Sequence, residues 1–380
     1  MKLSRSIKVA AIAAAVVLTA TSPAFAGTTI SGAGSTFAAP LIGACKTAWQ
    51  NSTGNTVTYG GGGSGTGRSN ADKGVGDFNF SDATYTPAKS SIIHIPVISA
   101  PIAIAYNLNK KQTVYLSPET LSNIFAGKIQ YWDDPAITAD NNGTSPQVTF
   151  KKDASGNVVK DKSGKPVVLK TINVKRYFTL PHQKIIVVYR ADGSGTTQNL
   201  VNMFIKKFPS VWSKASSSTF TSVFPGNIND IANLGRFQAA TGSAGVTALA
   251  AKTKYSITYV EASYATAQGL GVASIKNANG QYQTADAGGT AAFLNGASAS
   301  SDGKLTFDYD TKNAGAYILG IVSYALVDTA AIGASAAATK SFLSALLDSK
   351  CPTTDATLQY STITGSLLAT NQALIAKLKG

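Results

Sequence analysis

Short apolar runs alternate with segments of helical periodicity along most of the chain. Runs typical of buried strands occupy 56–59, 102–106, 185–189 and 321–327. Apolar residues recur every three or four positions at 40–50, 198–207 and 341–347. Strands that alternate with helices favour parallel sheets covered by helices. The pattern therefore predicts an α/β protein with mixed, mostly parallel sheets.

Two segments interrupt this alternation. The segment 151–176 carries eight lysines or arginines against two aspartates, and it contains turn sequences at 153–157 and 161–165. We expect an exposed basic β-hairpin arm inserted into a domain, whose charge mainly keeps a long loop solvated. The second segment, 277–304, is rich in Gly, Ala and Ser and predicts a mobile excursion on the surface.

The first 26 residues have the three parts of a secretory signal peptide. A basic start is followed by an apolar stretch over 9–20 and by the small-x-small sequence Ala24-Phe25-Ala26. We expect cleavage before Gly27 and an exported protein, which stays in the periplasm or leaves the cell. The best later candidate for a membrane span, 317–336, is interrupted by glycine and aspartate residues.

The net charge of the chain indicates which kinds of partner it can bind. The formal net charge of +14 falls by three to +11 once the basic residues of the signal are removed, which favours anionic partners. Nucleic acid is not expected, because the sequence has neither a basic helix interleaved with aromatic residues nor a zinc-finger spacing.

The only two cysteines, Cys45 and Cys351, lie near the ends of the exported chain. In an oxidising compartment they are a candidate disulfide, and the alternative is two buried free thiols.

The turn between the third predicted strand and the following helix has the chemistry of an anion site. Its sequence is RADGSGT, residues 190–196. The first N–H groups of a helix carry a partial positive charge, and glycines allow an anion to approach them. Ser194 and Thr196 can donate hydrogen bonds, and Arg190 offers a charged fork that Asp192 can orient. The alternative is a helix capped by Ser194 or Thr196 beside a surface ion pair.

Three further stretches have similar chemistry. The loop 31–40 leads into the first helix and places Thr36 and the backbone N–H of Phe37 near its N-terminus. The glycine-rich run 59–67 follows a strand and can form a backbone nest for an oxyanion. Asp82 then offers a carboxylate at the end of an apolar pair. Each stretch is a weak signal when taken alone.

Enzyme chemistry has little support in the sequence. Glycines at 60, 62 and 65 fit a dinucleotide fingerprint, but 68–74 is a poor start for an apolar crossover helix. The sequence contains no Walker loop and no Gly-x-Ser-x-Gly elbow. The two histidines, His94 and His182, come without clustered metal ligands, and a structural role is expected for His94 in its apolar run. We therefore expect no catalytic residues, no metal and no cofactor.

Six blocks occur in the order and spacing of one known family. They are GAGSTFAAP (32–40), the Gly and Ser run that contains Ser64, DFNFSDA (77–83), IFAGKIQYWDD (124–134), RADGSGTT (190–197) and YVEASYA (259–265). Through almost the whole exported chain, the sequence resembles the phosphate-binding protein of bacterial phosphate ABC transporters. The resemblance implies the periplasmic-binding-protein fold, with two α/β lobes joined by a two-stranded hinge. It implies lobe 1 at 27–104 and 318–380, and lobe 2 at 105–317, so that both cysteines fall in one lobe.

The resemblance also implies a phosphate site with ligands from both lobes. In lobe 1 they are Thr36, the backbone of Phe37, Ser64 and Asp82, the last of which accepts the proton of phosphate. In lobe 2 they are Arg190, Ser194, Gly195 and Thr196, with Asp192 holding Arg190. The chain departs from the family at Gly65, where a second serine is usual, and in the turn 242–245. The stretch 225–241 is longer than usual, and the arm at 151–176 is extra.

These observations predict an exported monomer that captures inorganic phosphate and delivers it to the membrane permease of a phosphate ABC transporter. One alternative is a receptor for another oxyanion, such as sulfate. Asp82 argues against sulfate, because a fully ionised anion has no proton to donate to a buried carboxylate and is repelled by it. The other alternative is a secreted phosphatase or a surface protein with the same fold, for which the sequence offers no nucleophile beside a base.

Overall fold

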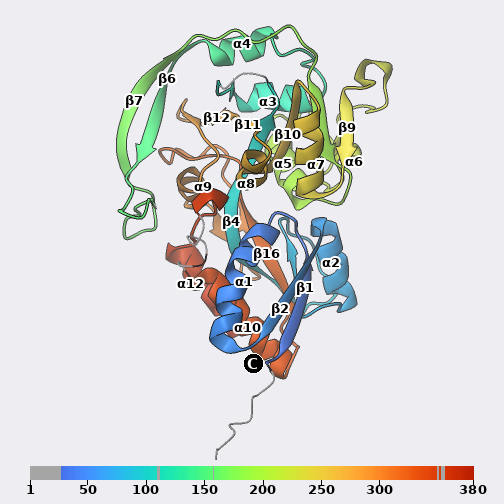
Figure 1. Cartoon of the computed structure of the whole chain (residues 1–380), viewed down its shortest axis with the longest axis vertical. Helices are drawn as coiled ribbons and strands as arrows, with labels where there is room; N and C mark the ends of the chain where they lie inside the picture. Colours follow the sequence, from blue (N-terminus) through green and yellow to red (C-terminus); the bar gives the residue numbers. More distant parts are fainter. Residues whose placement is uncertain (1–26, 109–111, 157, 349–350, 352–355) are drawn as a thin grey trace, which may run out of the picture.

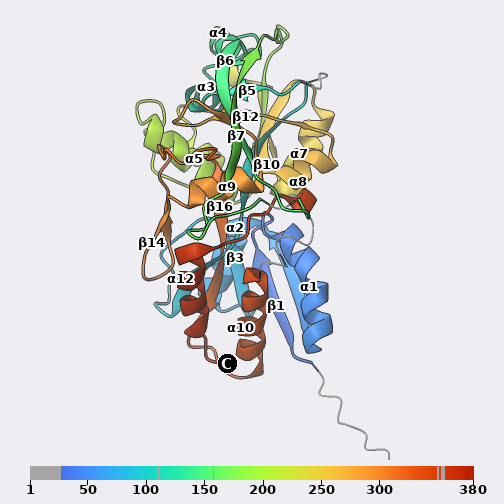
Figure 2. The ribbon, with the colours of Figure 1, turned by 90° about the vertical axis from the view of Figure 1, so that its left-hand side faces the viewer.

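The computed structural model describes residues 27–108, 112–156, 158–348, 351 and 356–380. The predicted signal peptide lies outside these residues. Two α/β parts are stacked end to end, and the first strand and the C-terminus belong to the same part (Figure 1, Figure 2). Among the residues that the structure describes, no helix is both long and apolar enough to cross a membrane.

A nine-stranded mixed sheet runs through both parts. In spatial order its strands are β2 (Thr56–Gly62), β1 (Thr29–Gly34), β3 (Phe78–Ser81), β16 (Gly320–Asp328), β4 (Ile92–Tyr106), β10 (Ser256–Glu261), β8 (Ile186–Arg190) and β9 (Phe237–Ala240), and β11 (Gly271–Val272) also pairs with β4. Pairs at the two edges are parallel, as between β1 and β2 or β8 and β9. The central pairs of β16 and β4 with their neighbours are antiparallel. The predicted α/β class is therefore confirmed.

The long strand β4 joins the two parts. All 15 of its residues are buried; its first ten, 92–101, lie along β16, and its last five pair with β10. We call 27–101 with 320–380 lobe 1, and 102–319 lobe 2. The chain crosses between the lobes twice, side by side, where the Ile102 N–H donates to the Leu319 carbonyl at 2.8 Å. The boundaries predicted at 104/105 and 317/318 lie close to this change of partner and stay a prediction.

Four described helices cover the sheet in lobe 1. They are α1 (Ala39–Thr53), α2 (Gly63–Lys73), α10 (Ala334–Leu347) and α12 (Gly365–Ala376). The helices predicted at 40–50 and 341–347 are α1 and α10. The Phe342 ring lies 5.5 Å from that of Phe78 and 5.1 Å from that of Trp49, measured between centroids. Buried aromatic contacts of this kind fix α1 and α10 against β3.

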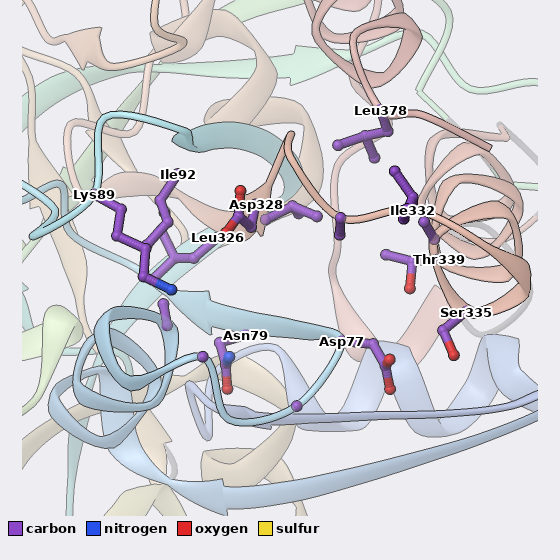
Figure 3. Close-up of a pocket in the computed structure, with 16 residues that line it drawn as sticks. Asp77, Asn79, Lys89, Ile92, Leu326, Asp328, Ile332, Ser335, Thr339 and Leu378 are labelled. Atoms are coloured by element: carbon purple, nitrogen blue, oxygen red, sulfur yellow. The ribbon is translucent and has the colours of Figure 1, made fainter.

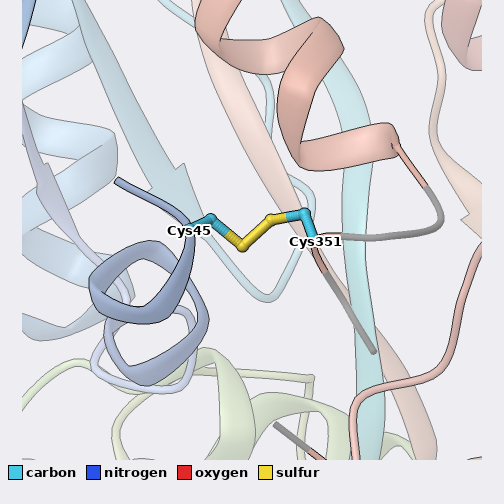
Figure 4. Close-up of a disulfide and its surroundings, with 2 residues drawn as sticks. All are labelled: Cys45 and Cys351. Carbon is cyan, nitrogen blue, oxygen red and sulfur yellow. A yellow bond between two sulfur atoms is a disulfide. The ribbon is translucent and has the colours of Figure 1, made fainter. Parts of the chain in front are cut away.

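A disulfide joins Cys45 of α1 to Cys351 (Figure 4). Their Cα atoms are 5.5 Å apart although they are separated by 306 positions in the sequence. The predicted bridge is confirmed, and it ties the first helix to the C-terminal region within lobe 1. Cross-linking two positions so far apart restricts the unfolded chain strongly.

Lobe 2 contains smaller elements around its half of the sheet. Its helices are α3 (Pro118–Phe125), α4 (Pro135–Asn141), α5 (Gly195–Lys207), α6 (Phe220–Val223), α7 (Gly242–Lys252), α8 (Ala262–Ala267) and α9 (Ala287–Leu294). Short strands complete it: β5 (Tyr115–Leu116), β12 (Ser274–Lys276), β13 (Tyr282–Gln283), β14 (Ser298–Ala299) and β15 (Leu305–Thr306). Phe125 packs edge-on against Tyr259, and the Tyr259 hydroxyl accepts from the Arg190 N–H at 3.1 Å. The core therefore holds the end of β8 in place.

The basic arm is a two-stranded antiparallel ribbon, β6 (Gly143–Phe150) and β7 (Val168–Arg176), that runs down one side of the molecule (Figure 1, Figure 2). Near its tip, Lys160 Nζ donates to the Thr362 carbonyl of lobe 1 at 2.6 Å. Burial lowers the pKa of Lys160 to about 8. The predicted hairpin, 151–176, includes only the tip and the second strand. The first strand was missed because its sequence is polar and contains a proline.

The segment 277–304 was predicted to be a mobile surface excursion, which is wrong for the part up to Leu294, whereas the strand β14 that follows is exposed. The segment contains the buried helix α9, which contacts β4 and β16 near the crossing between the lobes. The helix α9 packs closely against its neighbours, since a Cβ added to Gly289 would lie 2.8 Å from the Cβ of Tyr317. Small residues therefore serve close packing here, whereas their composition alone suggested a flexible loop.

Candidate functional site

Four helices begin around one point between the lobes: α1 and α2 of lobe 1, and α5 and α7 of lobe 2. The hydroxyl oxygens of Thr36, before α1, and Ser243, in the first turn of α7, are 3.0 Å apart. Gly195 begins α5 directly against α2, because a Cβ added to it would lie 2.6 Å from Ser64 Oγ. Helix N-termini present unpaired N–H groups and the positive ends of helix dipoles. This arrangement suits an anion.

Asp82 follows β3, and its carboxylate is buried in this cluster. Ser35 Oγ and Ser323 Oγ donate to Oδ1, the latter at 2.7 Å, and Ser64 Oγ donates to Oδ2 at 3.1 Å. A carboxylate accepts about four hydrogen bonds, so these described donors leave one position on Oδ2. Burial raises the pKa of Asp82, although the serine hydroxyls and Arg190 oppose the shift. The Asp82 carboxyl group can therefore accept one further hydrogen bond.

Arg190 ends β8 and forms a bidentate pair with Asp192. Its Nε donates to Oδ1 at 2.7 Å and its Nη2 to Oδ2 at 2.5 Å, while Oδ1 also accepts from the Gly242 N–H at 2.8 Å. Burial alone would lower the pKa of Arg190, but Asp192 outweighs burial and raises that pKa. Only 3% of Arg190 is exposed, so the alternative of a surface ion pair is wrong. The guanidinium is held charged in one orientation.

The turn after Arg190 combines a capped helix with an unpaired hydroxyl. Ser194 Oγ accepts from the Thr197 N–H at 3.1 Å, so the helix cap of the alternative interpretation is present, and the Ser194 hydroxyl hydrogen can still be donated to an acceptor. Thr196 is buried, and its Oγ1 has no hydrogen-bond partner among the described residues. A buried hydroxyl without a partner is destabilising by about 1–3 kcal/mol. A ligand that hydrogen-bonds to Thr196 would remove this cost.

Thr36 and Phe37 form the turn that leads into α1. Thr36 Oγ1 accepts from the Ser243 N–H at 3.3 Å, in addition to its contact with Ser243 Oγ. The Phe37 ring is buried, and its carbonyl accepts from the Tyr360 hydroxyl at 2.5 Å. The turn is therefore held by contacts from both lobes.

Further hydrogen bonds close the lobes on each other. They are Gly65 N–H to Gly193 O at 2.8 Å, Arg68 Nη2 to Ser218 Oγ at 2.8 Å and Asn199 Nδ2 to Asp82 O at 2.6 Å. The described structure is thus a closed form, and it brings all the predicted ligands to one region. Their role as ligands stays a prediction.

The sequence analysis did not assign four polar residues of this region to the site: Ser35, Ser243, Glu261 and Ser323. Glu261 ends β10, its Oε1 accepts from Ser243 Oγ at 3.1 Å, and its Oε2 has no partner among the described residues. Burial raises the pKa of Glu261 to about 7. An acidic residue at the end of a buried strand is a signal that could have found Glu261. Ser323 gives no such signal, because it lies within an apolar strand.

A cavity of about 370 Å³ lies elsewhere in lobe 1 (Figure 3). It is lined by Asn79 of β3, Leu326 of β16 and Thr339 of α10, together with Lys89 and Asp328, and none of the predicted ligands lines it. The side-chain oxygens of Asn79 and Thr339 are buried and have no partner among the described residues. This cavity is therefore separate from the interlobe site.

Two phosphate-binding proteins are similar to this chain in amino-acid sequence. Phosphate-binding protein PstS of Methanocaldococcus jannaschii is 31% identical over 239 residues, which cover 60% of this chain and 51% of that protein. Phosphate-binding protein PstS of Pasteurella multocida is 30% identical over 259 residues, which cover 67% of this chain and 62% of that protein. The chain spans about half to two thirds of the length of these relatives. Their names confirm the resemblance to phosphate-binding proteins.

A solved structure and a protein-family model are also similar to this chain. The structure of a high-affinity periplasmic phosphate-binding protein (PfluDING), bound with phosphate, matches with a TM-score of 0.65 and 20% identity, over 91% of this chain and 93% of that one. The match confirms the predicted periplasmic-binding-protein fold. A family model described as the PBP superfamily domain matches residues 19–350. The chain therefore belongs to the PBP superfamily.

Proposed function

We propose that this chain captures inorganic phosphate between its two lobes. The observation that carries the proposal is the buried Asp82 carboxylate, which keeps one acceptor position within a cluster of hydrogen-bond donors. Both phosphate species present near pH 7 carry a proton that can donate to this position. The names of the relatives support the same ligand.

The two lobes supply complementary donors to the anion. Lobe 1 offers the turn at Thr36 and Phe37 and the N–H of Ser64 at the start of α2, because the Ser64 hydroxyl hydrogen is donated to Asp82. Lobe 2 offers Arg190 with the first turn of α5, where Ser194 and Thr196 carry hydroxyls and Gly195 an N–H group. Because Asp192 already balances the charge of Arg190, much of the attraction comes from helix N-termini and neutral donors. Such donors bind an oxyanion without an excess of positive side chains.

The receptor would work outside the cytoplasm as a monomer. The signal-like first 26 residues support export, and the six family blocks support delivery of phosphate to the membrane permease of an ABC transporter. Movement of the lobes about the paired crossing at Ile102 and Leu319 would open the site for release. In this function the chain binds and hands over its ligand without changing it chemically.

One purified sample can test the proposal against both alternatives. Protein stripped of bound anion is titrated with phosphate, arsenate and sulfate in a calorimeter, and the same sample is assayed for phosphatase activity. We expect tight binding of phosphate, binding of arsenate, no response to millimolar sulfate and no hydrolysis. Comparable binding of sulfate would favour a general oxyanion receptor, and turnover of a phosphate ester would favour the enzyme.

A further inference from the structure

Ser243 contacts three parts of the anion site. It is the second residue of α7 and is 1% exposed. Its Oγ lies 3.0 Å from Thr36 Oγ1, 3.1 Å from Glu261 Oε1 and 3.5 Å from Arg190 Nη1, and its N–H donates to Thr36 Oγ1 at 3.3 Å. Thr36 belongs to lobe 1 and Ser243 to lobe 2. A single residue of lobe 2 therefore makes two hydrogen bonds to lobe 1 that exist only when the lobes are closed.

The donors and acceptors around Ser243 fix the direction of these bonds. A serine hydroxyl has one hydrogen, which Ser243 donates to Glu261 Oε1. Toward Thr36, Ser243 Oγ must then accept, so the Thr36 hydroxyl hydrogen points at Ser243. The Thr36 oxygen in turn accepts from the Ser243 N–H. The Thr36 side chain is thus engaged by lobe 2, which leaves the backbone of the turn at Thr36 and Phe37 to face an anion.

We propose that Ser243 is a positioning residue of the phosphate site: it acts through Thr36, holds lobe 2 against the turn that begins α1, and slows the release of bound phosphate. Glu261 supports it by keeping the Ser243 hydroxyl directed away from Thr36. This inference rests on the proposed function, because slow release has meaning only if phosphate binds. It also gives a role to Glu261, an acidic residue that would otherwise only repel an anion bound at this site.

The test compares Ser243→Ala, Thr36→Val and the double variant. Ser243→Ala removes the hydroxyl but keeps the N–H at the start of α7. A single lost hydrogen bond to a charged network corresponds to about a tenfold change in affinity. We expect Ser243→Ala to raise the phosphate dissociation rate about tenfold in stopped-flow measurements, with little change in the association rate. Because Ser243 acts through Thr36, the double variant should release phosphate no faster than Thr36→Val alone.

Ser256→Ala is the matched control. Ser256 begins β10, the strand that ends at Glu261; it is fully buried, and its Oγ donates to the Ala250 carbonyl at 2.9 Å within lobe 2. The substitution therefore removes the same chemical group and a similar hydrogen bond without touching lobe 1. We expect a loss of thermal stability like that of Ser243→Ala and an unchanged phosphate dissociation rate.

The outcomes separate this inference from the function on which it rests. A parent protein that binds no phosphate would overturn both proposals. If the parent binds phosphate and Ser243→Ala releases it at the parental rate, only the role of Ser243 is wrong. The same conclusion follows if the effects of Ser243→Ala and Thr36→Val add up in the double variant, since Ser243 would then act independently of Thr36.

Discussion

Asp82→Asn is the sharpest perturbation of the proposed phosphate site. The substitution keeps the shape of the side chain, removes its negative charge and replaces one acceptor oxygen by a donor group. In the parent protein, Oδ2 accepts from Ser64 Oγ and keeps the position that a phosphate proton would fill. In the variant the amide would face both Ser64 and the anion as a donor. Phosphate loses the acceptor for its proton, whereas sulfate loses a neighbour that repels it.

The size of the change follows from these contacts. A hydrogen bond between a phosphate hydroxyl and a buried carboxylate is charge-assisted and contributes about 1.5–3 kcal/mol. Two like charges about 4 Å apart repel by about 4 kcal/mol at an effective dielectric constant of about 20. Phosphate experiences both terms in the parent protein, but sulfate experiences only the repulsion. The preference for phosphate over sulfate should therefore fall by about ten- to a hundredfold, mainly because sulfate binds more tightly.

Calorimetric titration of phosphate and sulfate into both proteins measures this preference directly. Asp72→Asn is a suitable control, because it removes the same charge from α2 while Asp72 bonds to the Tyr85 hydroxyl and the Ala88 N–H outside the site. The control should keep the parental selectivity. A parent protein that binds sulfate as well as phosphate, or an Asp82→Asn variant with unchanged selectivity, would refute the reasoning.

Three further changes test other parts of the structure. Arg190→Ala should weaken phosphate binding at least tenfold in calorimetry while the protein stays folded, since it removes a buried charged donor worth about 1.5–3 kcal/mol; parental affinity would contradict the ligand role. Replacing Cys45 and Cys351 by alanine should lower the free energy of unfolding in urea by about 2–5 kcal/mol, and an unchanged midpoint would show that the bridge does not stabilise the protein. Burial raises the pKa of Glu261 to about 7 from its ordinary 4.5, even though the charge of Arg190 favours its ionised form, so the folded protein holds a proton that the unfolded chain releases. Stability should therefore fall as pH rises through this window, and Glu261→Gln should flatten that slope in thermal denaturation between about pH 5 and pH 8.

Much of the architecture could be predicted because it is encoded locally. Strands such as 185–189 are short apolar runs between turn residues, and the turn at 190–196 has glycines and donors at adjacent positions in the sequence. Block order along the chain then indicated the family. The disulfide needed in addition the expectation that both ends of the chain share one lobe. These features depend on neighbours in sequence or on a whole-chain pattern.

The remaining features depend on pairs that only the folded chain brings together. Ser323 donates to Asp82 across 241 positions, and Ser243 meets Thr36 across 207. Nothing in the local sequence of either serine distinguishes it from an ordinary buried or capping residue. The helix α9 was missed for a different reason, because close packing and flexibility both favour small side chains.

The strand order also sets the sequence of events by which the molecule can assemble. Lobe 2 is one continuous stretch, whereas the sheet of lobe 1 needs β16, which lies between β3 and β4 and comes after every element of lobe 2. If the chain becomes available for folding from its N-terminus onward, all of lobe 2 is present while the sheet of lobe 1 still lacks its central strand. Once β16 is in place, α10 follows, and Cys351 can reach Cys45. Lobe 1 begins the chain but is the last to be completed, since its helix α12 follows even Cys351 in the sequence.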